Sequence, residues 1–199
     1  MKKENGFVLL FIRLFVVVIA IFIFLLSVIM AKVEVNTEIS KYNDYIGANA
    51  KEEYRKKWGM DEEIFPKMIT KNMHVKDYKM VYYNPWDAQY LSYIVISYND
   101  QDYKKEVERL EKYESTEYKG YYGVTGFSKY KLLAMYADSY SGFVYAITDN
   151  KDTIIYVELI FCNYCYDLDY KEYINKDYLP DGFDARDDNE YQKEMFYKH

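Results

Sequence analysis

The chain begins with a long run of apolar residues. From Leu14 to Ala31, the eighteen residues LFVVVIAIFIFLLSVIMA include one polar side chain, Ser27. Because an α-helix rises about 1.5 Å per residue, this run spans about 27 Å, close to the hydrocarbon thickness of a bilayer. The pattern predicts a transmembrane anchor helix over 14–31, and the apolar residues 7–12 allow an earlier start.

Charged residues around this run indicate its direction. Lys2, Lys3 and Arg13 precede it, and positive charges beside a first helix favour a cytoplasmic N-terminus. Residues 1–13 are therefore expected in the cytoplasm and residues 32–199 outside it, in a single-pass cell-membrane protein. Arg13 is expected at the membrane interface, where its long side chain reaches the headgroups. Basic residues also follow the run, so the positive charges are not confined to the side predicted to be cytoplasmic.

A cleaved signal peptide is the alternative interpretation of the same run. Arg13 would then end the charged segment, and Ala31 would stand at the cleavage site. The run is longer than the usual 7–15 apolar residues of a signal peptide, and Ile29 is large for the position near the cleavage site. The sequence favours the uncleaved anchor over a secreted soluble protein.

After residue 32 the apolar positions predict one α+β domain. Residues 36–58 carry apolar side chains three and four positions apart, which predicts an amphipathic helix. A second helix is predicted over 100–114, with Asn99 or Asp100 as its N-cap. A short helix is expected near 169–175, before a polar tail.

Runs of β-branched and aromatic residues predict about five strands. Their ranges are 75–83, 89–98, 130–137, 142–148 and 153–161. The connections between neighbouring strands are mostly of hairpin length, so the sheet should be mostly antiparallel, with the two amphipathic helices on one face.

Composition narrows the functions open to this domain. Once Lys2, Lys3, Arg13 and Glu4 are set apart, 23 basic and 31 acidic residues remain, a net charge of −8. A nucleic-acid surface needs clustered basic residues, so nucleic acid is not expected as a partner. The 26 tyrosines are spread along the chain, which favours a compositional bias over a surface of stacking platforms for sugars or peptides.

Cys162 and Cys165 are the two cysteines of the chain. A disulfide between them is a candidate if the domain is extracytoplasmic. Residues three apart on a regular strand point to opposite faces, so the strand would have to end or bulge at Asn163 and Tyr164. Redox chemistry is less favoured, since Asp167 and Asp169 would raise the pKa of the thiols.

Other chemistry has weaker support in the sequence. A zinc site would need two further ligands beside the two cysteines, and the chain offers only His74, which is expected at the surface, and the terminal residue His199. An acidic cluster near the C-terminus is a candidate calcium site, but its spacing matches no EF-hand. Its members are Asp181, Asp184, Asp187, Asp188 and Glu190. No metal, cofactor or catalytic residue is predicted.

These observations favour a membrane-anchored, non-catalytic binding module at the cell envelope. Its expected partners are membrane lipid through residues 14–31 and an envelope protein, a polymer or a small ligand. The alternatives are a cell-envelope hydrolase that uses scattered carboxylates or the Cys162 region, and a secreted protein released by signal cleavage.

Overall fold

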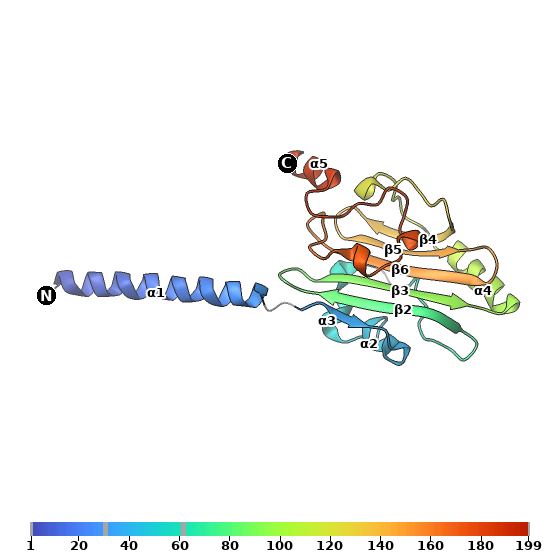
Figure 1. Ribbon diagram of the computed structural model, residues 1–199, viewed down its shortest axis with the longest axis horizontal. Helices are drawn as coiled ribbons and strands as arrows, with labels where there is room; N and C mark the ends of the chain where they lie inside the picture. The colour runs from blue at the N-terminus through green and yellow to red at the C-terminus, as the bar shows by residue number, and fades with distance from the viewer. Residues whose placement is uncertain (1, 30–31, 61–62, 199) are drawn as a thin grey trace.

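The N-terminal apolar run forms one long helix that extends away from a folded domain. The computed structural model describes residues 2–29, 32–60 and 63–198. Helix α1, Lys2–Ile29, projects from the domain (Figure 1). Its stretch Val8–Leu26 is unburied and apolar enough to cross a bilayer, a property that anchors share with signal sequences. The stretch begins before the predicted span, and the predicted end at Met30 and Ala31 lies outside the described residues.

A six-stranded antiparallel sheet forms the centre of the domain. The strand order is β1-β2-β3-β6-β5-β4. The strands are β1 Glu34–Asn36, β2 His74–Tyr83, β3 Gln89–Ser97, β4 Lys131–Asp138, β5 Gly142–Thr148 and β6 Thr153–Ile160. The α+β class is therefore confirmed, and β2 to β6 match the five predicted strands to within one residue at each end.

The sixth strand, β1, is a correction to the predicted count. It pairs with β2 at the edge of the sheet, with Glu34 opposite Tyr82 and Asn36 opposite Met80. Three residues are too short a run for alternation to be visible, so the sequence pattern could not reveal this strand.

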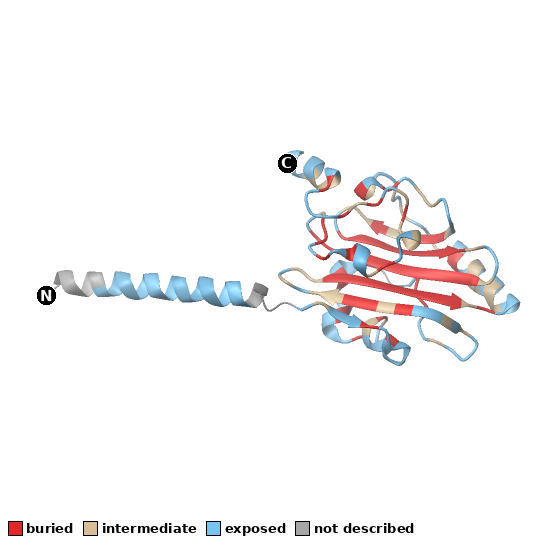
Figure 2. Ribbon diagram, viewed as in Figure 1, coloured by how far each residue is buried: buried red, intermediate tan, exposed pale blue. Residues whose placement is uncertain are grey.

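Most of the central strand residues are buried (Figure 2), and their apolar side chains belong to two separate clusters. One cluster lies beneath the segment 42–65 and the helix α4, Asp100–Glu111, and includes Leu110. The other lies beneath the irregular chain of 118–130 and 162–189. The prediction of a single covered face was therefore incomplete. Every residue of β5 and β6 is buried, as expected of central strands packed on both sides.

The predicted helix over 36–58 is wrong in its backbone. The segment contains only short pieces: η1 Ile39–Lys41, α2 Tyr42–Tyr45, α3 Glu52–Arg55 and η2 Lys57–Gly59. Gly47 adopts a left-handed φ of 87°, and Lys57 and Trp58 are also left-handed. The apolar pattern nevertheless predicted burial well, because Tyr42 and Tyr54 are core residues.

The chain after residue 120 contains more short helical elements than predicted. They are η3 Tyr121–Gly123, η4 Tyr170–Glu172, η5 Lys176–Tyr178 and α5 Glu190–Tyr197. The predicted helix near 169–175 is thus a single 3-10 turn, and the expected polar tail ends in a helix. Asn189 caps α5 by accepting a hydrogen bond from the Gln192 backbone, a local signal that the sequence did contain.

The strand registers define two ends of the sheet. At the α1 end, β1 begins beside the β2–β3 turn 84–88, and the turns 139–141 and 162–165 lie close by. At the opposite, α4 end, β3 leads into α4 (Figure 1). Nine residues of β3 separate the two ends by about 30 Å, at about 3.3 Å per residue.

Candidate functional site

A hollow of about 320 Å³ opens at the α4 end, between α4 and the loop before β2. This volume is within the range of small-ligand pockets. Its walls combine an apolar thioether, an aromatic ring, neutral polar groups and charges of both signs. The lining residues are Thr70, Asn72, Met73, Tyr98, Asp102, Lys105, Glu106 and Arg109.

Helix α4 supplies the charged wall of this pocket. Asn99 caps the helix as predicted, since its side chain accepts hydrogen bonds from the backbone of Gln101 and Asp102. Residues three and four apart on a helix share a face, so Asp102, Lys105 and Arg109 point toward the same side. The cap therefore fixes where the charged wall begins.

A chain of hydrogen bonds forms the floor. The hydroxyls of Tyr98 and Tyr156 lie 2.8 Å apart, and the Tyr156 hydroxyl donates to Glu106 Oε1 over 2.7 Å. Burial is the main cause that raises the pKa of both tyrosines well above the usual value, so both hydroxyls stay protonated at neutral pH. Of the two tyrosines only Tyr98 lines the pocket, and the buried Tyr156 hydroxyl behind it links Tyr98 to Glu106.

Arg109 holds the two sides of the pocket together. Its guanidinium donates to both carboxylate oxygens of Glu106, over 2.9 and 2.7 Å. It also donates to the backbone oxygens of Glu63 and Ile64, over 2.9 and 2.8 Å. A bidentate pair of this kind orders both partners, so the arginine fixes the loop beside α4. The exposed rim at Thr70, Asn72 and Lys105 is left to contact a ligand.

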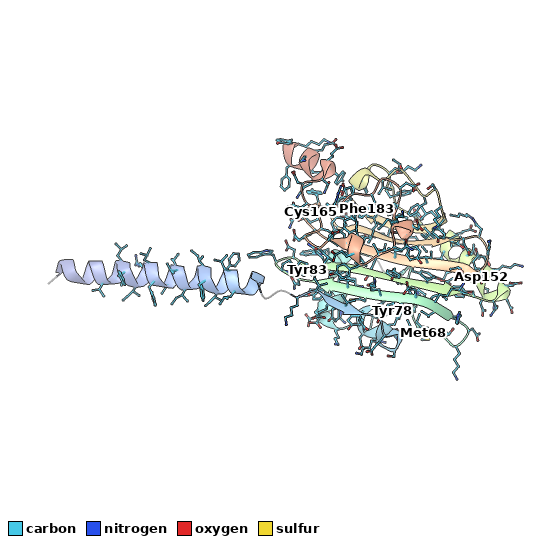
Figure 3. The ribbon with its side chains drawn as sticks, viewed as in Figure 1. Met68, Tyr78, Tyr83, Asp152, Cys165 and Phe183 are labelled. Atoms are coloured by element: carbon cyan, nitrogen blue, oxygen red, sulfur yellow. The ribbon has the colours of Figure 1, made fainter. Side chains whose placement is uncertain are left out.

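Cys162 and Cys165 pair across a tight turn that follows β6, and Figure 3 shows Cys165 on the α1 side of the domain. Asn163 and Tyr164 both have φ near 60°, and the Cys165 amide donates to the Cys162 oxygen over 3.3 Å. These are the features of a type I′ turn, so the strand ends where a disulfide required it to end. Opposed residues of such a hairpin have Cα atoms about 5.5 Å apart, within the disulfide range. Both cysteines are thiols here, and the disulfide stays a prediction.

The environment of these thiols opposes nucleophilic chemistry. Burial, followed by a hydrogen bond to Asp87 and the charge of that carboxylate, raises the pKa of Cys162 to about 12. Burial and Asp167 raise that of Cys165 to about 11. Because the thiolate is the reactive form, both thiols are unreactive at neutral pH. His74 is exposed and pairs with Ser97 at the α4 end, so the structure does not bring it to Cys162.

The acidic residues of the candidate calcium site do not converge, and three of them have their own nearby partners. Asp184 pairs with Arg186, Asp188 lies 3.2 Å from Lys193, and Asp181 accepts a hydrogen bond from Ser128. A second hollow of about 340 Å³ near α5 is lined in part by three of the acidic residues: Asp184, Asp188 and Glu190. Over residues 2–29, 32–60 and 63–198, no three His, Cys, Asp or Glu side chains are placed to share a metal ion. His199 lies outside the described residues.

A buried ion pair links the start of the domain to the middle of β6. Lys57 Nζ lies 3.0 and 2.9 Å from the two carboxylate oxygens of Glu158, and Ser92 Oγ donates to the same carboxylate over 2.6 Å. This pair was not predicted from the sequence. The available signal was Glu158 itself, a charge inside the apolar run TIIYVELIF, because a buried charge requires a partner.

Comparisons with known protein families, with curated proteins and with solved structures find no match. The function is therefore argued from the geometry of the domain alone.

Proposed function

We propose that this protein is a single-pass, N-terminally anchored binding module that presents the α4-end pocket outside the cytoplasm. In this proposal α1 crosses the bilayer, the N-terminus with Lys2 and Lys3 stays in the cytoplasm, and residues 32–199 form the binding domain. Residues Val8–Leu26 support the anchor, since their side chains are exposed and would otherwise meet water. Arg13 lies inside this stretch, and its guanidinium would reach the nearer headgroup layer by snorkelling.

One observation carries the binding role. The pocket lies at the end of the sheet opposite the attachment of α1, about 30 Å away along β3. A domain held by α1 would thus direct this pocket away from the bilayer, toward molecules of the envelope. Its floor is ordered by hydrogen bonds before any ligand arrives, which lowers the entropic cost of binding.

The lining indicates the kind of ligand. Met73 and the ring of Tyr98 provide apolar contact, Asn72 and Thr70 provide neutral hydrogen-bonding groups, and Lys105 provides a cation near the rim. A short polar segment of a protein or of an envelope polymer suits such a mixed, open hollow better than an apolar small molecule does.

The anchor is tested by topology and by mass. Alkaline phosphatase, which is active only outside the cytoplasm, is fused after residue 199 and should be active in cells. The intact mass of the membrane-extracted protein should include residues 1–31. An inactive fusion would contradict the orientation, and a mass without residues 1–31 would favour the secreted alternative.

Photo-crosslinking tests the pocket. A photoreactive amino acid is placed at Asn72, on the rim, or at Lys171, an exposed residue of η4 on the other face of the sheet. The full-length protein is then irradiated in cells. We expect a discrete adduct from position 72 only, and its loss when Lys105→Glu reverses the charge of the rim. Equal adducts from both positions, or none from position 72, would contradict the role of this pocket.

A further inference from the structure

The most exposed aromatic side chains of the described domain gather at the α1 end. Trp58 is 44% exposed, Trp86 is 51% exposed and Tyr140 is 39% exposed. Phe196 and Tyr197, at the end of α5, are 64% and 90% exposed, and α5 lies on the same side of the domain as α1 (Figure 1). Exposure of aromatic rings to water is energetically unfavourable. Their concentration at one end of the domain therefore indicates a surface that contacts a partner.

Hydrogen bonds join the turns that carry these rings. Trp58 Nε1 donates to the Ala88 oxygen over 2.8 Å, which ties η2 to the turn 84–88. Asn163 Nδ2 donates to Asp87 over 2.7 Å, and the Tyr140 hydroxyl donates to Asn163 Oδ1 over 2.7 Å. The turns 84–88, 139–141 and 162–165 therefore form one continuous surface.

Ring contacts extend this surface to α5. Tyr164 packs edge-on against Tyr140, with ring centroids 4.9 Å apart, and against Phe196 at 6.4 Å. We call the surface formed by Trp58, Trp86, Tyr140, Tyr164 and Phe196 the aromatic end.

The chain connection keeps the aromatic end close to α1. Four residues separate Ile29 from Glu34, where β1 begins, and the five Cα–Cα steps between them span at most about 18 Å when extended. The ring of Trp86 also lies 4.1 Å from the ring of Phe24, which belongs to the apolar stretch of α1. A bilayer that held this stretch would therefore reach the turn 84–88.

We propose that the aromatic end is a membrane-contact surface, seated on the headgroup layer of the same bilayer that holds α1. This inference rests on the anchoring part of the proposed function. Trp and Tyr suit that layer because each has an apolar ring and one polar group, so that the ring enters the acyl boundary while the polar group stays hydrated. The domain carries a net charge of −8, so aromatic contact and not attraction to anionic lipid provides the affinity.

The contact orients the domain. A single helix with a short connection fixes the distance from the membrane but leaves the domain able to tilt. A second contact through the turn 84–88 and α5 restricts that tilt, and the sheet then stands with its α4 end directed away from the lipid (Figure 3). Met68 and Asp152, both labelled in that view, lie on the side remote from α1.

Tryptophan fluorescence tests this placement in the full-length protein. Trp58 and Trp86 are the two tryptophans of the chain, so Trp58→Phe leaves Trp86 as the single reporter. The protein is reconstituted in phosphatidylcholine vesicles with bromine near the headgroup or near the chain ends. We expect bromine near the headgroup to quench Trp86 at least about twofold more strongly than bromine at the chain ends.

Two single-tryptophan variants in the Trp58→Phe, Trp86→Phe background serve as controls. Ile19→Trp, within α1, should be quenched from the chain ends and reports whether α1 is inserted. Met68→Trp, at an exposed position remote from α1, should not be quenched. Circular dichroism checks that each variant is folded.

The outcomes separate the two proposals. If Ile19→Trp is quenched and Trp86 is not, the anchor stands and the membrane-contact surface is refuted. If Trp86 and Met68→Trp are quenched equally, the domain has no fixed orientation on the bilayer, and the inference also fails. If Ile19→Trp is not quenched, both proposals fall. Quenching of Trp86 that requires anionic lipid and disappears at high salt would assign the contact to basic residues instead, contrary to the inference.

Discussion

Lys57 and Glu158 form an ion pair whose side chains are 2% and 1% exposed. The chain reaches this arrangement through three successive left-handed residues, with φ of 35° at Lys57, 53° at Trp58 and 79° at Gly59. Left-handed conformations cost non-glycine residues of order 1 kcal/mol each, and they persist only where surrounding contacts impose them. Here the turn buries the lysine and directs the neighbouring tryptophan outward to Ala88. One strained turn thus serves both the core and the aromatic end.

Removal of one partner of this pair should be far more harmful than removal of both. Lys57→Met leaves the Glu158 carboxylate buried without the compensating ammonium, and we expect the free energy of unfolding to fall by about 3–5 kcal/mol. The double variant Lys57→Met, Glu158→Met replaces both charges by apolar groups and should recover most of that loss. Urea denaturation measures both, and a double variant no more stable than the single one would contradict the prediction.

The hydroxyl of Tyr78 is buried and has no hydrogen-bond partner among the described residues. A buried polar group of this kind costs about 1–3 kcal/mol, so Tyr78→Phe should leave stability unchanged or increase it by up to about 1 kcal/mol. Tyr42→Phe is the matched control, because the Tyr42 hydroxyl donates to the Pro66 oxygen over 2.7 Å. The control should lose about 1 kcal/mol, and equal effects at both positions would be inconsistent with this reasoning.

Among the helices, α4 both packs on the sheet and lines the candidate pocket. Its buried face packs on the sheet through Leu110, while its exposed face forms the charged wall. Asp100 and Asp102 lie in the first turn of the helix, where acidic side chains interact favourably with the helix dipole. The stability of this helix therefore controls the shape of the pocket.

The N-cap of α4 is a direct test of that link. Asn99→Ala removes the acceptor for two backbone amides and should lower the free energy of unfolding by about 1 kcal/mol. Asn99→Asp keeps an acceptor and should remain within about 0.5 kcal/mol of the parent protein. Thermal unfolding gives the two values, and hydrogen exchange of the first turn of α4 should rise in the alanine variant alone.

Elements with a clear period could be predicted from the sequence, and those set by distant contacts could not. The strands β2 to β6 and the cap at Asn99 follow from local patterns and were predicted to within a residue or so. The segment 36–58 was different, because its backbone is bent by Gly47 and by a lysine whose partner lies 101 residues away in sequence. The spacing of apolar residues predicts which side chains are buried, but it does not predict where the backbone turns.

The candidate pocket could not be predicted from the sequence, because it also depends on contacts between residues far apart in the chain. Its charged wall could be read from the face of α4, but its floor depends on the meeting of Tyr98 with Tyr156, from β6. The tyrosines were expected to reflect a compositional bias, and eleven of the 26 lie in the core of the domain. A buried tyrosine is useful there because its ring packs while its hydroxyl satisfies backbone or side-chain groups.

At the scale of the whole molecule, the core and the helix α1 are independent. The two buried clusters draw all their members from residues after 32, and the side chains of Val8–Leu26 are exposed. Helix α1 contacts the domain at its surface, where the ring of Phe24 lies 4.1 Å from that of Trp86. Stability of the domain should therefore not depend on α1, whereas its position in the cell should.

Truncation tests this independence and the domain boundary at residue 32. The fragment 32–199 keeps β1, whose Glu34 accepts a hydrogen bond from the Tyr54 hydroxyl over 2.7 Å and whose Asn36 is buried. It should unfold cooperatively at the midpoint of the full-length protein in mild detergent. The fragment 38–199 lacks β1 and exposes the edge of β2, a loss of about 1–2 kcal/mol that should lower the midpoint by several degrees. If the longer fragment also unfolds early or aggregates, then α1 contributes to the folded domain, and the boundary at residue 32 is wrong.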